Sequence, residues 1–272
     1  MNPKYLTFSL CLLLTACSVE SLPTSLPVES VQVAEGQSIL IRVNEGDVVV
    51  YGGGEGQAHV EGQMLFPSNT VYSVTTIDDQ IQIVVNYTGK RSSDPPVHLE
   101  ISVPNNAALA IETDSASIAV RDYSGELEAA SVSGDVLIED AHGGITARSN
   151  RGDVTVKNSA GIISVVGNYG LLTLDDANGD IGVSTIMGTI NFTGLIDAGD
   201  DVRLETDHGP VDVTLEADST LTLAAQSTSG DMACMVSGIN SSTRWCDGQF
   251  GTGDGALQIR TVSGAVWIRT MP

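Results

Sequence analysis

Glycine recurs every nine residues along the middle of the chain, and this repeat constrains the fold more than any other feature. Eight successive units carry it, at positions 125, 134, 143, 152, 161, 170, 179 and 188. The residues two and four places after each glycine are always apolar, as in Val154 and Val156 after Gly152. Apolar, polar, apolar is the order of a strand with one buried face. Each unit therefore predicts a short strand followed by a turn.

The same phase extends beyond these eight units. It continues backward through 107 and 116 and returns after Gly209, Gly230, Gly255 and Gly264, with insertions at 193–200 and 238–252. Similar sequences at 133–136 and 151–154 lie 18 residues apart, which suggests two strands per layer. We predict an all-β fold, a β-solenoid of stacked nine-residue strand-turn units with aliphatic rows in a narrow interior. An antiparallel meander folded as a sandwich is the alternative, because it also alternates at this spacing.

The turns of the repeat carry glycine together with Asp or Asn. We expect the glycines to use positive φ and the neighbouring acids to bond their own backbone. An 18-residue layer would stack Asp135 on Asp153, and we interpret these aspartates as turn-stabilising, since the nonapeptide calcium repeat is not matched. The repeat also accounts for Arg151-Gly152-Asp153, which is otherwise the tripeptide that integrin-binding proteins present.

Residues 31–104 precede the regular repeat and alternate less evenly. Strands are expected at 39–43, 47–51, 71–76, 80–85 and 97–103. We interpret this part as a strand-rich N-terminal cap, because an open end of stacked strands would invite aggregation. The β-solenoid repeat domain then occupies 105–272.

The start of the chain has the pattern of a secretion signal. Lys4 precedes an apolar run at 6–16, which is too short to span a bilayer. Leu14-Thr15-Ala16-Cys17 resembles the bacterial lipobox, and that resemblance implies removal of 1–16 and a lipid on Cys17. An ordinary secretory peptide is the alternative. Residues 17–30 are rich in Ser, Pro and Glu and predict a flexible tether to the membrane.

Charge and motifs exclude several classes of function. A formal net charge of −22, with three lysines, excludes a nucleic-acid binder that works through a basic patch. The histidines at 59, 98, 142 and 208 match no metal-ligand spacing, so we expect no metal and no cofactor. The motifs HExxH, GxSxG, CxxC and SxxK do not occur. A non-catalytic protein is therefore favoured over an enzyme.

Two cysteines remain in the mature chain after Cys11 is removed and Cys17 is lipidated. An even pair in an exported protein predicts a disulfide between Cys234 and Cys246. The segment between them shows no strand pattern and would be stabilised most by such a bond. The alternative is that Cys234 is a buried free thiol, because it falls on an inward position of the repeat.

Several stretches carry a family resemblance. Leu99-Glu-Ile-Ser-Val-Pro104, Ala107-Ala-Leu-Ala-Ile-Glu-Thr113 and the Ser-x-Ser-Gly-Asp-Val at 131–136 resemble the bacterial putative adhesin family, domains of unknown function. The resemblance covers about 31–270 and implies a β-solenoid after a short strand-rich part. Its motifs are structural, so no binding residue is carried over and the ligand-binding residues stay unknown.

These features predict a lipid-anchored extracytoplasmic protein at the cell surface or in the periplasm. We expect a non-catalytic, adhesin-like binding or structural module, attached to the membrane through its N-terminal lipid. Its partner would be a surface polysaccharide or an envelope protein. The alternatives are an envelope structural or sensory lipoprotein with a periplasmic partner, and a polysaccharide-active enzyme.

Overall fold

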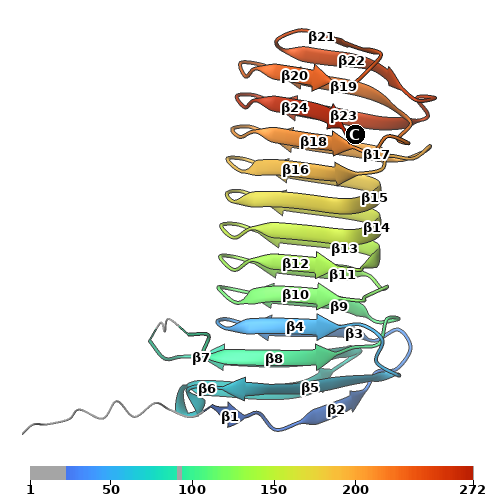
Figure 1. The fold of residues 1–272 in the computed structure, drawn as a ribbon. Coiled ribbons are helices and arrows are strands. Elements are labelled where there is room, and N and C mark those ends of the chain that lie inside the picture. The colour runs from blue at the N-terminus through green and yellow to red at the C-terminus, as the bar shows by residue number, and fades with distance from the viewer. Residues whose placement is uncertain (1–22, 91–93, 272) are drawn as a thin grey trace, which may run out of the picture.

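The chain is all-β in the computed structural model, which describes residues 23–90 and 94–271. Its strands join one hydrogen-bonded sheet that winds along the long axis of the molecule without closing on itself (Figure 1). The expected signal peptide at 1–16 and Cys17 lie outside the described residues.

The strands are short, and a single 3-10 turn, η1 (Pro67–Asn69), lies among those described. The N-terminal strands are β1 (Thr24–Ser25), β2 (Glu29–Gln32), β3 (Ser38–Val43), β4 (Asp47–Tyr51), β5 (Gln57–Met64), β6 (Thr70–Ile77), β7 (Gln80–Tyr87) and β8 (Val97–Ser102). The central strands are β9 (Ala108–Thr113), β10 (Ser117–Arg121), β11 (Leu127–Ser131), β12 (Val136–Glu139), β13 (His142–Ser149), β14 (Val154–Gly167), β15 (Leu171–Thr185) and β16 (Thr189–Gly194). The C-terminal strands are β17 (Asp201–Thr206), β18 (Val211–Leu215), β19 (Leu221–Ser227), β20 (Met232–Met235), β21 (Ile239–Ser241), β22 (Trp245–Phe250), β23 (Gly255–Thr261) and β24 (Val266–Thr270).

Two ladders of parallel strands run side by side along the molecule. The first ladder contains β3, β9, β11 and β13, and the second contains β4, β10 and β12. The long strands β14 and β15 bend and contribute to both ladders. Partners in the middle are 18 residues apart, as in Leu127 with Ile145 and Val136 with Val154. This parallel pairing differs from the antiparallel pairing of a meander.

The aliphatic rows predicted from the repeat face inward from both ladders. Val154 and Val156 are fully buried, whereas Thr155 between them lies on the outer face. Where the first ladder turns into the second, a buried Ser or Thr ends the strand and accepts a hydrogen bond from the glycine three residues later. Examples are Gly134 N to Ser131 Oγ at 2.8 Å and Gly152 N to Ser149 Oγ at 2.9 Å. The hydroxyls therefore satisfy turn amides that would otherwise be buried without a partner.

Glycines at the corners of the stack differ in backbone conformation, as Gly161 and Gly152 show. At the corner after the second ladder, Gly161 has a φ of 130°, which agrees with the positive φ expected for the glycines of the turns. At the corner after the first ladder, Gly152 has no positive φ, so that expectation is wrong for this glycine. A Cβ at 152 would lie 2.2 Å from Gly134 O in the preceding layer. Close contact between stacked turns, not backbone conformation, therefore requires glycine at position 152, whereas Gly170 at the same corner of the next layer has a φ of 101°.

The stack does not follow the order of the sequence at its ends. β3 lies between β7 and β9, and β4 lies between β8 and β10. Likewise β23 lies between β17 and β19, and β24 lies between β18 and β20. Each of β3, β4, β23 and β24 is thus bonded on both sides, so none of these four strands is an exposed edge. The parallel pairing of β3 and β4 continues that of β9 and β10.

Antiparallel strands close both ends of the stack. β5 pairs with β8, β6 with β7, and β1 and β2 pair with β5. The predicted tether over 17–30 is therefore wrong from Thr24 onward, because these residues find hydrogen-bond partners on β5. At the other end β22 pairs antiparallel with β19 and with β21. The segment between the cysteines, for which no strand was expected, thus contains β21.

A disulfide links Cys234 on β20 to Cys246 on β22, with the two Cα atoms 6.6 Å apart. Cys246 is fully buried, and Cys234 packs against the core from a partly buried position. The bond joins the end strands of the two ladders. It therefore holds the β21–β22 hairpin on the end of the stack.

Candidate ligand-binding groove

Four strands lie side by side on the outer face of the first ladder near the C-terminal end, in the order β17, β23, β19, β22. Each contributes two exposed side chains, and the register aligns them in two rows across the strands. One row is Glu205, Arg260, Gln226 and Trp245; the other is Arg203, Gln258, Ala224 and Asp247. Because alternate residues of a strand face the same side, all eight side chains face outward together.

A hollow of about 570 Å³ lies over these strands, and we call it the Trp245 groove. Its lining residues are Arg203, Glu205, Ala224, Ala225, Gln226, Trp245, Cys246, Asp247, Gln258, Ile259 and Arg260. Ala224 explains the depression, because its methyl group leaves the space that the longer Asp247 and Gln258 side chains enclose on either side. The exposed fraction of Trp245 is 45%, so its indole forms an accessible wall.

A second hollow of about 410 Å³ adjoins the groove at the edge of the first ladder. Glu205 and Arg260 line both hollows. The second hollow continues past Thr206 toward Asn168 and Ile186 in the turns of earlier layers. The two hollows together can hold an extended ligand.

The two arginines of the groove differ in their partners. Arg203 donates a hydrogen bond to Gln258 Oε1 at 3.3 Å. Arg260 forms no ion pair or hydrogen bond through its side chain among the described residues, although Glu205 is its neighbour in the ladder. Its guanidinium is therefore available to a ligand.

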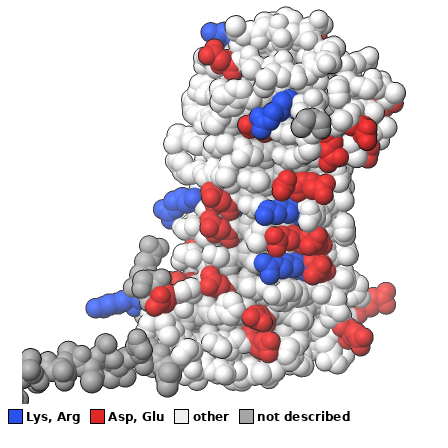
Figure 2. Space-filling model, in the orientation of Figure 1, with Lys and Arg blue, Asp and Glu red and all other residues white. Residues whose placement is uncertain are grey.

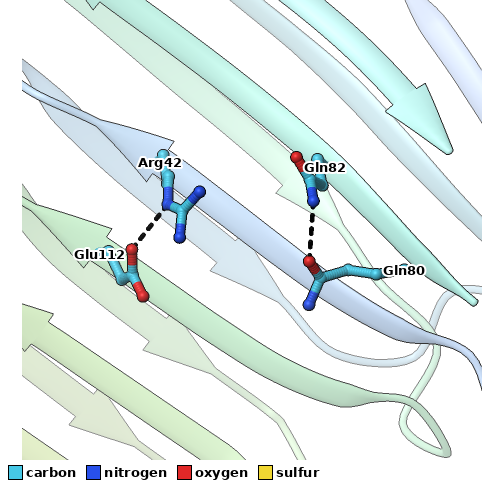
Figure 3. A network of polar contacts seen from close by, with 4 residues as sticks. All are labelled: Arg42, Gln80, Gln82 and Glu112. Atoms are coloured by element: carbon cyan, nitrogen blue, oxygen red, sulfur yellow. Dashed lines mark hydrogen bonds and ion pairs between the residues drawn. The ribbon is translucent and has the colours of Figure 1, made fainter. Parts of the chain in front are cut away.

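Near its N-terminal end, the outer face of the first ladder differs from the Trp245 groove. A hollow of about 490 Å³ lies there beside β3 and β9. There Arg42 Nε is 2.7 Å from Glu112 Oε2, and Gln82 donates to Gln80 Oε1 at 2.9 Å (Figure 3). The guanidinium of Arg42 is thus already paired, unlike that of Arg260. We therefore place the candidate site at the Trp245 groove.

Charges alternate along the outer face of the second ladder, and Figure 2 shows red and blue side chains succeeding one another at mid-height. The register sets Arg121 beside Glu139, Glu139 beside Lys157, and Lys157 beside Asp175. Arg121 Nε is 2.9 Å from Glu139 Oε2, and this hydrogen bond raises the pKa of the arginine. Arg121 is thus paired, and Lys157 lies between two carboxylates in the ladder, so positive and negative charges balance along this face.

The stacked aspartates of the repeat bond to backbone amides. Asp135 Oδ1 accepts from Asp153 N at 2.9 Å, and Asp153 Oδ1 accepts from Leu171 N at 2.7 Å. The amide belongs to the next layer and not to the residue's own turn, which corrects the sequence-based expectation. Within residues 23–90 and 94–271, no group of three His, Cys, Asp or Glu side chains is placed to hold a metal ion. No helix in the same residues is long and apolar enough to span a membrane.

The two carboxylates of the Trp245 groove itself, Glu205 and Asp247, start on strands that are far apart. Glu205 and Asp247 belong to β17 and β22, which are separated by three strand spacings. Strands about 4.8 Å apart put these side chains roughly 14 Å apart at their origins. Glycosidase carboxyl pairs are separated by about 5–9.5 Å.

Comparisons with known proteins identify similar folds only. No family model matches the chain, and no curated protein matches it. A putative adhesin from Bacteroides fragilis is similar in structure, with a TM-score of 0.51, 10% identity, and coverage of 90% of this chain and 97% of that one. A putative adhesin from Parabacteroides distasonis has a TM-score of 0.45 and 9% identity over 93% of this chain and 98% of that one. At such identities the likeness to the Bacteroides fragilis protein concerns the fold.

Sequence reasoning did not find the Trp245 groove. The phase after Gly255 correctly predicts β23, but nothing in the sequence indicates that β23 inserts between β17 and β19. The one available signal was the position of Trp245 next to a disulfide-bonded cysteine. An aromatic residue on an otherwise polar segment of an exported protein is a reason to look for a binding surface.

Proposed function

We propose that the chain is an extracytoplasmic β-solenoid lipoprotein that acts as a non-catalytic, adhesin-like binding module. The 18-residue stacking of parallel strands supports the solenoid architecture. The apolar run at 6–16 and the lipobox-like sequence ending at Cys17 support export and lipidation. The similarity of its fold to a putative adhesin is compatible with a non-enzymatic role.

The observation that carries the proposal is the position of the Trp245 groove relative to the N-terminus. The first described strands, β1 and β2, lie at one end of the stack, and the strands that line the groove, β17, β23, β19 and β22, lie near the other (Figure 1). Eight strand spacings separate β7 from β23, which corresponds to about 38 Å. A lipid on Cys17 would hold the N-terminal end at the membrane and present the groove away from it. An anchored binding protein requires this arrangement.

Lipidation and exposure are tested together in cells. Wild-type protein should incorporate labelled palmitate, and Cys17→Ala should not. An epitope after Pro272, away from the β21–β22 hairpin, should then be lost when intact cells are treated with protease. Protection until lysis would place the protein inside the envelope and replace the adhesive role with a structural or sensory one.

A further inference from the structure

The Trp245 groove combines three kinds of side chain that recognise different parts of a ligand. Trp245 offers a flat apolar face, and Arg260 offers an unpaired cation. Between them Gln226 offers an amide that both donates and accepts hydrogen bonds. Trp245 and Arg260 start two strand spacings apart, about 10 Å, which leaves room for one ring-sized group over Gln226.

The charge balance of the groove limits the ligand. Arg203 and Arg260 are accompanied by Glu205 and Asp247, so the groove is neutral in a chain with a net charge of −22. A polyanion such as a phosphorylated chain would be repelled by the two carboxylates. A ligand with one negative group beside Arg260 and several hydroxyls would use the guanidinium and the carboxylate acceptors together.

We propose that the Trp245 groove binds a carboxylated saccharide, with a hexuronate ring stacked on the indole of Trp245 and its carboxylate paired with Arg260. This inference rests on the proposed function and adds the class of ligand. The hydroxyl groups of the sugar donate hydrogen bonds to Asp247 and Glu205. They both donate hydrogen bonds to, and accept them from, the side-chain amides of Gln226 and Gln258. Indole faces suit the apolar C–H face of a sugar ring, and guanidinium binds carboxylate through two parallel hydrogen bonds.

The adjoining hollow points to an oligomer. It continues from Glu205 and Arg260 past Thr206, so a chain of sugars can extend from the ring on Trp245 along the edge of the first ladder. The proposed ligand is therefore a polysaccharide in which uronic acid residues are separated by neutral sugars, so that each bound segment places one carboxylate beside Arg260. A single free sugar would occupy only part of this surface and should bind more weakly than a trimer.

The test uses the full lipidated chain in detergent and titrates it by calorimetry with trisaccharides in which one uronic acid residue, galacturonic, mannuronic or glucuronic, stands between two neutral hexoses. The methyl ester of each trimer is the matched neutral ligand. We expect at least one acid trimer to bind and its ester to bind at least tenfold more weakly. Arg260→Gln should weaken binding of the acid about 10- to 100-fold while leaving that of the ester nearly unchanged. Trp245→Ala should abolish both.

Matched control variants separate the site from general surface effects. Trp267→Ala removes an exposed tryptophan from the other ladder, and Arg148→Gln removes an arginine that is paired with Glu128 on the same face. Neither variant should change binding. Thermal unfolding of every variant must match the wild type within a few degrees for the comparison to count.

Several results would overturn the proposal. Equal affinity for acid and ester would show a site for neutral sugar, and tighter binding of a poly-glutamate peptide would show a site for acidic peptide. Failure of all acid trimers to bind would also reject it. Chain shortening of a trimer, detected by mass spectrometry in the same samples, would instead contradict the non-catalytic proposed function and leave the ligand class standing.

Discussion

The close contact at Gly152 permits a quantitative test of the stacked architecture. A Cβ at this position would lie 2.2 Å from Gly134 O and 2.5 Å from Gly134 C, whereas ordinary contacts begin at 3.4 Å. The opposing atoms are backbone atoms, which cannot rotate away. The two turns would have to separate by about 1 Å in a close-packed molecule.

Gly152→Ala should therefore lower the free energy of unfolding by about 2–3 kcal/mol. Overpacking of this kind costs about 1–3 kcal/mol. Separation of the turns also weakens the hydrogen bond that Ser149 Oγ donates to Gly134 O in the preceding layer at 3.0 Å, a bond of the kind that contributes about 1 kcal/mol. In a domain of this size the loss corresponds to a fall in melting temperature of about 4–12 °C.

Gly182→Ala is the matched control, because it is the same chemical change within the same repeat region. No atom lies within 4 Å of a Cβ at this position, and Gly182 has no positive φ. Alanine should be neutral or stabilise the strand by up to about 1 kcal/mol. Differential scanning calorimetry and urea unfolding measure both variants. An equal change in the free energy of unfolding for both variants, or a Gly152→Ala protein as stable as the wild type, would refute the close contact between stacked turns.

Three further changes test other parts of the structure. Val154→Asp should destabilise the protein by several kcal/mol in urea unfolding because its side chain is fully buried, whereas Thr155→Asp on the outer face should be nearly neutral; equal losses would contradict the register. Replacing both Cys234 and Cys246 by Ser should cost about 3 kcal/mol and make the melting temperature insensitive to reductant, since the bond closes a short loop; an unchanged stability would show that the hairpin is held by other contacts. Burial, with a smaller effect of Glu126, raises the pKa of the Tyr123 hydroxyl from 10 to about 12. The folded state therefore holds the hydroxyl proton more tightly than the unfolded state, and the free energy of unfolding should fall as the pH rises from 10 to 12. Tyr123→Phe should reduce this pH dependence in unfolding measured across the same range.

Local sequence was sufficient for the strands of the repeat. The inward rows that include Val154 and Leu172 follow from period-two alternation, which depends only on neighbouring residues. The strands at 39–43, 47–51 and 80–85 were found for the same reason. β5 was missed, because its sequence Gln57–Met64 contains few apolar residues and its burial comes from pairing with β8 and β2.

The sequence by itself predicted short strands with one buried face, because the glycine and aliphatic positions recur in a fixed nine-residue phase. The likeness of 133–136 to 151–154 only suggested an 18-residue layer, and the pairing of the strands shows it. Tertiary structure decided the order of the strands at both ends, since hydrogen bonding between strands depends on register and not on proximity in the chain. The insertion of β23 between β17 and β19 brings Arg260 between Glu205 and Gln226, residues far from it in sequence. The groove exists only through that insertion, and no local pattern could have indicated it.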